Sequence, residues 1–256
     1  MVKYLLKKSY QLKDLKEIEF KDLWGDRGVF TTMWIFENPS KILFFQEHIN
    51  NLIKSTKAFS IYKSSLRSDI LRLIKNNINS KVRYNHLLRV AVNKSILSIS
   101  LRKRIKPKLN FDLKLVKLKR QKPEFKNLKY KEIIKHLSKL DNSKSDIGLC
   151  SNQKIFETGT SNLLFVKDDK FFSPIDKFYK GITYKFFKSK IKKITRKDIF
   201  VSNLKEFDEI ILIGSGKGVA SVKTINQIKW KRKSLKFYKI LSKHYQSAIN
   251  KCPRYK

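Results

Sequence analysis

Several residue types that organise common protein classes are scarce in this sequence. Eight Gly and five Pro in 256 residues exclude collagen-like and low-complexity chains. The two cysteines, Cys150 and Cys252, match neither a disulfide framework nor the spacing of a metal site. The chain has no apolar run of about 18 residues, and its first residues lack the apolar stretch of a signal peptide. We therefore expect a cytoplasmic protein without a metal ion or a membrane partner.

Acidic residues are also scarce, since 21 Asp and Glu stand against 59 Lys and Arg, for a formal net charge of +38. Such a surplus of cations favours nucleic-acid binding, because Lys and Arg neutralise phosphates. The lysines are spread from Lys3 to Lys256, however, and no RNA-recognition signature, zinc finger or basic-zipper heptad is present. We predict no specific nucleic-acid partner. A non-catalytic basic protein that binds nucleic acid nonspecifically remains an alternative from another functional class.

Hydrophobic periodicity predicts that helices and strands alternate along the whole chain, and 41% apolar residues suffice for a core. Helical periods occur at 45–59, 68–75, 130–140, 182–194 and 235–249. Strand patterns occur at 34–45 (a hairpin), 87–99, 147–149, 154–156, 162–166, 170–172 and 207–213. The basic stretch 101–135 connects two such halves. The expected fold class is α/β, or mixed α+β.

A glycine-rich segment at 214–218 follows the last predicted strand. Its glycines have neither the spacing of a P-loop nor that of a dinucleotide-binding fingerprint. Backbone amides and the Ser215 hydroxyl could still hold a phosphate group. A simple tight turn is the alternative interpretation.

The stretch 156–165 reads Phe-Glu-Thr-Gly-Thr-Ser-Asn-Leu-Leu-Phe, in which a carboxylate, hydroxyls and an amide precede an apolar strand. A hairpin turn would explain these residues taken singly. The string resembles the E-x-x-x-S-N-[IL]-F signature of the class IV (fold-type IV) family of pyridoxal-phosphate-dependent aminotransferases, with one extra Leu before Phe165. That family contains branched-chain and D-amino-acid aminotransferases and aminodeoxychorismate lyases.

Other segments resemble further motifs of this family, in the same order along the chain. They are 28–32 (G-x-F-[ET]-T), 48–52 (H-x-x-R-L), 126–130 (K-x-x-N-Y), 181–183 (G-I-T) and 208–215 (D-E, a strand, then Gly-Ser). Each motif alone is weak, and the shared order is what carries the resemblance.

The resemblance implies pyridoxal 5'-phosphate as the cofactor and assigns roles to several residues. Lys126 would be the catalytic lysine that forms a Schiff base with the cofactor, and Lys129 would replace it if the register slips. Glu157 would face the pyridine nitrogen, and Tyr130 would hydrogen-bond the ring oxygen. Further cofactor-binding residues are expected within the matched motifs. They are Ser161, Asn162, Ile182, Thr183 and Ser215.

One position departs from the family pattern in a way that affects phosphate binding. Asn51 stands where the family usually has an arginine that clamps the phosphate, so a bidentate cation is lost. Lys54, close to one helical turn further on, is predicted to replace it as a point charge. We therefore include Asn51 and Lys54 among the expected cofactor-binding residues. The departure also leaves open a degenerate member of the family.

The resemblance implies two α/β domains, 1–106 and a PLP-binding domain 107–256, with the cofactor between them, and a homodimer. The compact length, Phe30-Thr31-Thr32 and the short stretch before Gly181 favour the lyase. That enzyme releases pyruvate and 4-aminobenzoate from 4-amino-4-deoxychorismate, in folate biosynthesis. A branched-chain or D-amino-acid aminotransferase is the alternative. In either case the substrate is a small amino compound that carries carboxylates.

Overall fold

The computed structural model describes residues 4–255, which divide into two compact units, each described here by itself. The N-terminal unit comprises the described residues through Arg104, together with Phe125–Tyr130 and the C-terminal residues from Lys251. The C-terminal unit comprises Ile105–Glu124 and Lys131–Asn250. These units differ from the predicted domains by placing 125–130 and the last residues of the chain with the N-terminal unit.

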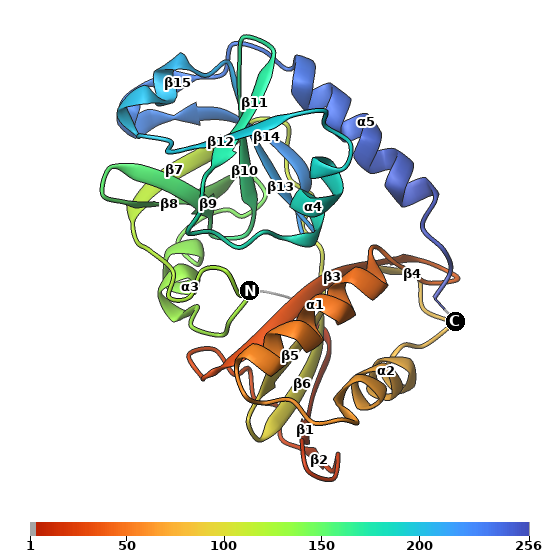
Figure 1. The fold of residues 1–256 in the computed structure, drawn as a ribbon. Coiled ribbons are helices and arrows are strands. Elements are labelled where there is room, and N and C mark those ends of the chain that lie inside the picture. The colour runs from red at the N-terminus through yellow and green to blue at the C-terminus, as the bar shows by residue number, and fades with distance from the viewer. Residues whose placement is uncertain (1–3, 256) are drawn as a thin grey trace. The chain divides into compact units, whose positions relative to one another are not determined.

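The N-terminal unit contains a six-stranded antiparallel sheet in the order β2-β1-β6-β5-β3-β4 (Figure 1). Two helices, α1 (Phe45–Ala58) and α2 (Leu66–Asn77), follow β4 in the chain. The strands are β1 (Tyr4–Gln11), β2 (Glu17–Ile18), β3 (Gly28–Glu37), β4 (Lys41–Ile42), β5 (Tyr84–Asn93) and β6 (Ile96–Lys103). The predicted hairpin, both helices and the paired strands at 87–99 are all present.

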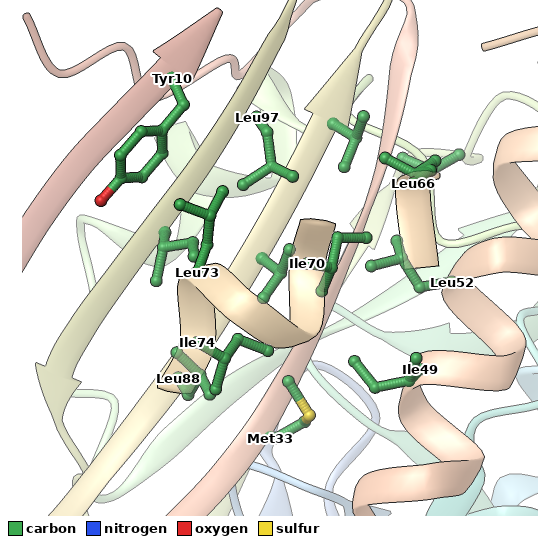
Figure 2. Close-up of a cluster of buried hydrophobic side chains, with 14 of the residues drawn as sticks. Tyr10, Met33, Ile49, Leu52, Leu66, Ile70, Leu73, Ile74, Leu88 and Leu97 are labelled. Atoms are coloured by element: carbon green, nitrogen blue, oxygen red, sulfur yellow. The ribbon is translucent and has the colours of Figure 1, made fainter. Parts of the chain in front are cut away.

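The core of the N-terminal unit lies where the helices pack on the sheet, as Figure 2 shows. Successive side chains of a strand point to opposite faces, so Val29, Met33 and Ile35 of β3 share one face, and all three are fully buried. Ile49 of α1 and Ile70 of α2 belong to the same buried cluster. Fully burying an aliphatic side chain contributes roughly 1.5–3 kcal/mol. This packing holds β3, the strand that carries the 28–32 motif.

A short segment of chain, 125–130, runs beside the start of β3. The Phe30 amide donates to the Lys126 carbonyl and the Leu128 amide donates to the Gly28 carbonyl, both at 2.9 Å. Gly28 is required here, because a Cβ on it would lie 2.4 Å from the Val92 carbonyl oxygen and 2.6 Å from a methyl of Leu128. These hydrogen bonds place Lys126 against β3.

The C-terminal unit contains a nine-stranded sheet in the order β12-β11-β10-β13-β14-β7-β8-β9, with β15 pairing off β14 (Figure 1). The pairs β11–β12, β14–β7 and β7–β8 are parallel, and the remaining pairs are antiparallel. The strands are β7 (Phe111–Lys117), β8 (Ser145–Ser151), β9 (Lys154–Thr158), β10 (Asn162–Lys167), β11 (Lys170–Pro174), β12 (Ile194–Lys197), β13 (Glu209–Gly214), β14 (Gly218–Ile225) and β15 (Trp230–Lys231).

Three α-helices and two short 3-10 turns complete the described part of the C-terminal unit. They are α3 (Lys131–Leu137), α4 (Ile182–Lys188), α5 (Lys236–Asn250), η1 (Ser202–Glu206) and η2 (Asn226–Ile228). The α5 helix packs on β13 and β14, and the Glu209 carboxylate accepts hydrogen bonds from two backbone amides in its first turn, at 2.9 Å each. The helix predicted at 182–194 is shorter than expected, because α4 ends at Lys188 and Ile194 begins the strand β12.

Helices and strands are thus mixed in both units, as predicted. Within residues 4–255, no helix combines the length and the apolar character that crossing a membrane requires.

Candidate active site

Lys126 of the N-terminal unit is half-buried, and its Nζ lies 5.1 Å from the ring centroid of Phe30. Lys129, the alternative lysine, is exposed, and its Nζ donates a 2.7 Å hydrogen bond to the Gly25 carbonyl. The two lysines therefore differ sharply in environment. A side-chain amine that acts as a nucleophile is favoured by a partly desolvated, apolar surrounding, which Lys126 has and Lys129 lacks.

Phe30 belongs to a group of three aromatic rings. Trp24, Phe30 and the predicted site residue Tyr130 contact one another, with ring centroids 4.9–5.7 Å apart. The guanidinium of Arg89, a residue of β5, lies 3.6 Å from the Trp24 ring centroid and 5.5 Å from that of Phe30. Phe30 thus has the ammonium of Lys126 and the guanidinium of Arg89 close to the same ring.

Arg89 is a buried cation, only 7% exposed. Its guanidinium pairs with the Asp22 carboxylate and donates to the Asp22 carbonyl at 2.7 Å. Burial lowers the pKa of Arg89 to about 10, although the charge of Asp22 raises it. Arg89 stays protonated at neutral pH, so the aromatic group holds a permanent, planar cation whose carboxylate partner is Asp22.

The histidine of the predicted 48–52 motif lies in the interior of the N-terminal unit. His48 of α1 is 3% exposed, and its Nδ1 shares a 2.8 Å hydrogen bond with the Thr31 hydroxyl of β3. Burial, with the charge of Lys126 as the second cause, lowers the pKa of His48 to about 3. His48 is therefore neutral at physiological pH. Its hydrogen bond to Thr31 links α1 to β3.

Asn51 and Lys54, the residues predicted to serve the phosphate, occupy successive turns of α1. Asn51 is half-buried and its carbonyl accepts from the Ser55 hydroxyl at 2.8 Å, whereas Lys54 is exposed. At about 100° per residue, Lys54 lies about 120° around the helix from the buried His48. The structure therefore presents Asn51 nearer than Lys54 to the face that carries His48, and a phosphate role for either residue stays a prediction.

In the C-terminal unit, Glu157 at the end of β9 forms a buried ion pair with Arg120. The side chains are 5% and 3% exposed, and Arg120 Nη1 lies 3.2 Å from Glu157 Oε2. The same oxygen accepts from the Tyr179 amide at 3.3 Å. A buried carboxylate needs such partners, because an unpaired charge in the interior is very costly. Arg120 is thus the counter-ion that allows Glu157 to be buried in ionised form.

Asn162, at the start of β10, organises the chain before α4. Its side-chain amide donates to the Tyr179 carbonyl, and its side-chain oxygen accepts from the Gly181 amide at 3.1 Å. A Cβ on Gly181 would lie 2.9 Å from that oxygen, so the close approach depends on glycine. Asn162 therefore positions Ile182 and the first turn of α4, and direct contact of Asn162 with a cofactor stays a prediction.

The hydroxyls predicted for phosphate binding come together in this unit. Thr183 Oγ1 of α4 lies 3.4 Å from Ser215 Oγ, in the turn after β13. Gly214 permits this turn to approach Ser161, because a Cβ on it would lie 3.0 Å from Ser161 Oγ. The first turn of α4 contains no acidic residue.

A cluster of polar residues around Asp146 connects the 158–161 turn with the 214–218 turn. Asp146 is fully buried, and its Oδ2 accepts from the hydroxyls of Thr158 at 2.9 Å and Thr160 at 2.6 Å. The Thr158 hydroxyl oxygen accepts from the Ser161 amide at 2.8 Å, while Lys217 Nζ lies 3.8 Å from Asp146 Oδ2. One carboxylate thus ties the 158–161 turn to the 214–218 turn.

These residues fit pyridoxal phosphate in their donor and acceptor chemistry. The hydroxyls of Thr183 and Ser215 are donors for a phosphate, and no carboxylate of the first turn of α4 opposes that charge. Glu157, ion-paired and buried, is an acceptor for a protonated ring nitrogen. Lys126 is a half-buried amine beside aromatic rings.

Sequence reasoning missed Arg89, Arg120 and Asp146. Nothing local distinguishes the two arginines among 59 cations, because their partners lie 67 and 37 residues away in the chain. A signal for Asp146 existed, since it lies at the start of the apolar strand β8 and a Thr-rich turn follows the next strand, β9. Asp146, Thr158 and Thr160 form the pattern D-x₁₁-T-x-T. This pattern indicates a carboxylate that accepts from two hydroxyls only if β8 is known to pair with β9.

Known proteins resemble this chain in sequence and in fold. A sequence model of the family Amino-transferase class IV matches residues 28–225, most of the chain. No curated protein matches the sequence. Among solved structures, the chain resembles a branched-chain aminotransferase from Thermoproteus uzoniensis crystallised with norvaline (15% identity, 95% of each chain covered, TM-score 0.76).

A second similar structure is an aminotransferase from Brucella abortus bound to PLP (17% identity, 94% of this chain and 98% of that chain, TM-score 0.72). The branched-chain amino acid aminotransferase from Thermobaculum terrenum, in its PLP-form, is also similar (13% identity, 94% of this chain and 93% of that chain, TM-score 0.74). At these identities the solved structures establish the fold alone, and the match to the family sequence model over 28–225 establishes membership. The chain belongs to the class IV aminotransferases, a family of pyridoxal-phosphate-dependent enzymes.

Proposed function

We propose that this protein is an aminotransferase that moves the amino group of a small carboxylate-bearing amino acid by means of pyridoxal phosphate. The observation that carries the proposal is that the Lys126 ammonium and the Arg89 guanidinium lie 5.1 and 5.5 Å from the ring centroid of Phe30. A reactive amine and a buried guanidinium beside one aromatic ring suit a substrate whose carboxylate and α-carbon are close together. The similar solved structures include branched-chain aminotransferases, which supports this alternative over the lyase favoured by the sequence.

The residues of the two units have separate roles. When bound, pyridoxal phosphate supplies an electrophilic carbon for the amino group and a ring that accepts electrons. Lys126 Nζ would hold the cofactor, and its amine would take and return the proton of the substrate α-carbon. Glu157, kept ionised by Arg120, holds the proton on the ring nitrogen. Thr183 and Ser215 donate hydrogen bonds to the phosphate.

The substrate is bound and shielded by residues of the aromatic group. Arg89, whose guanidinium lies over Trp24 and is held there by Asp22, directs positive charge toward the substrate carboxylate. Trp24, Phe30 and Tyr130 exclude water from the amine of Lys126, which strengthens the electrostatic interactions made there. The Tyr130 hydroxyl is also the donor expected for the ring oxygen of the cofactor.

The experiment compares wild-type protein with Lys126→Ala, using Lys129→Ala as the matched control. Each is incubated with pyridoxal phosphate, its visible absorption is recorded, and the mixture is reduced with borohydride before tryptic mass spectrometry. We expect an absorption band in the wild type and in Lys129→Ala, its loss in Lys126→Ala, and the reduced adduct on the peptide that contains Lys126. An adduct on Lys129, or no band in the wild type, would refute the assignment.

The reaction is decided by a second assay of the loaded protein. Transfer of an amino group from a branched-chain amino acid to 2-oxoglutarate would support the aminotransferase. Release of pyruvate from 4-amino-4-deoxychorismate without an amino acceptor would support the lyase instead. The lyase is the second candidate because of Phe30-Thr31-Thr32, in which Thr32 is half-buried on the same face of β3 as Phe30. Arg89→Gln should raise KM for either substrate while the absorption band persists.

A further inference from the structure

A groove on the C-terminal unit lies apart from all the residues assigned above. It has a volume of about 740 Å³ and is formed by β11, the chain from Lys190 to Thr195, and the first half of α5. None of the predicted cofactor-binding residues lines it. Its volume lies within the roughly 300–1,000 Å³ of small-molecule sites. The groove is therefore large enough to take a ligand of its own.

The floor of the groove is apolar. Phe171 of β11 and Phe237 of α5 meet edge to face, with ring centroids 4.9 Å apart and an interplanar angle of 84°. Leu241, one turn further along α5, is 1% exposed and closes the floor, while Ile240 is 42% exposed. An apolar floor that stays open to solvent favours a hydrocarbon ligand. Because the two rings pack against each other, they form no parallel platform on which bases could stack.

The rim of the groove is basic. Lys170, Lys190, Lys192 and Lys193 line it, all four are exposed, and none makes an ion pair with the described residues. Asp169 is the one acid among the described lining residues, and its carboxylate is already paired with Lys236 Nζ at 2.6 Å. The rim therefore has an excess of positive charge directly beside the apolar floor.

We propose that this groove binds a single-chain carboxylate amphiphile, a fatty acid, with its tail on the apolar floor and its carboxylate among the rim lysines. Charge complementarity selects an anion, and the floor selects a hydrocarbon body. A second copy of this chain is a poor occupant, because it also has a net charge of +38 and would be repelled.

Calorimetric titration of the full-length protein with monomeric dodecanoate tests the proposal. The first variant replaces Lys190, Lys192 and Lys193 by Ser. The matched control replaces Lys135, Lys139 and Lys205, which are exposed lysines of the same unit outside the groove. Three weakened surface ion pairs should reduce the affinity roughly tenfold in the first variant, and the control should bind like the wild type. Circular dichroism checks that both variants fold.

A second variant tests the floor. Ile240→Glu places a carboxylate beside the bound tail at an exposed position that folding tolerates, and it should abolish binding, whereas Ile240→Leu should preserve it. Dodecanol, which has the tail without the charge, should bind more weakly than dodecanoate. Three results would overturn the proposal: equal losses in the two lysine variants, unchanged binding in Ile240→Glu, or binding of anionic vesicles but not of monomeric dodecanoate. The last would identify a membrane-docking surface.

Discussion

Removing the Asp146 carboxylate provides a direct test of the C-terminal unit. The Asp146→Ala substitution removes a fully buried acceptor that serves the hydroxyls of Thr158 and Thr160. It also removes the counter-charge of Lys217, whose side chain is 8% exposed and whose Nζ lies 3.8 Å away. Both effects leave polar groups in the interior without a charged partner.

The expected loss of stability follows from these contacts. Removing one partner of a buried ion pair costs roughly 3–5 kcal/mol, because the remaining charge stays buried. The Asp146→Asn variant keeps one oxygen, which can accept from the hydroxyls of Thr158 and Thr160 as Oδ2 does, but it loses the negative charge and the second oxygen. Hydrogen bonds to charged groups contribute about 1 kcal/mol more than neutral ones, so Asp146→Asn should lose roughly half as much as Asp146→Ala.

Urea denaturation followed by circular dichroism measures the difference. With a slope of about 3 kcal/mol per molar urea, Asp146→Ala should lower the transition midpoint by roughly 1–1.7 M. The control is Asp198→Ala, which breaks the surface pair between Asp198 and Lys154, with side chains 40% and 28% exposed. Such pairs contribute at most about 1 kcal/mol.

A second substitution separates the buried charge from the lost hydrogen bonds. Lys217→Met, added to Asp146→Ala, removes the ammonium that has lost its carboxylate partner. It keeps an apolar stem of similar length over Phe111, whose ring centroid lies 4.6 Å from Lys217 Nζ. The double variant should recover part of the stability lost in Asp146→Ala. If Asp146→Ala unfolds at the same urea concentration as Asp198→Ala, or if Lys217→Met lowers stability further, the reasoning is wrong.

Three further predictions concern single residues. The folded-state pKa of His48, about 3, lies below the unfolded value of about 6.5, so only the unfolded chain gains this proton as pH falls. Stability should therefore drop by up to about 1.4 kcal/mol per pH unit between pH 6.5 and 3, a slope that His48→Gln should lack in urea titrations at several pH values. Gly28→Ala should lower the thermal midpoint by several degrees, because its Cβ would lie 2.4 Å from the Val92 carbonyl oxygen; an unchanged midpoint would contradict the clash. Burial raises the pKa of Cys150 to about 12 and that of Cys252 above its usual value, so a thiol reagent at neutral pH should label both cysteines only after denaturation.

Most elements were predictable because their local patterns agree with their tertiary surroundings. The helix at 45–59 has apolar residues at helical spacing, and α1 buries Ile49 and Leu52. One prediction failed where a tertiary contact decided the outcome, and the strands β1, β7 and β14 were not predicted. Ile191 and Ile194 continue the apolar spacing of α4, yet the helix ends at Lys188 because Ile194 starts β12, which pairs with β11. In β1, apolar and basic residues come in pairs rather than alternating, so its strand pattern was missed.

The candidate active site was likewise predictable from the sequence in part only. Motif order along the chain was enough to identify the family and to nominate Lys126, Glu157 and Thr183, because each motif is a short run of neighbouring residues. The structure adds that Lys126 has a more apolar environment than Lys129 and that Thr183 and Ser215 meet.

The sequence by itself therefore determined the family, the fold class and the positions of the motif residues. Only the tertiary structure decided which charges are buried and with what partner. Arg120 pairs with Glu157 across 37 residues of chain, and Arg89 with Asp22 across 67. The physical reason is that an ion pair depends on distance and local dielectric, which are properties of the folded chain. Among 59 cations, the folded environment alone distinguishes these arginines from the solvated ones.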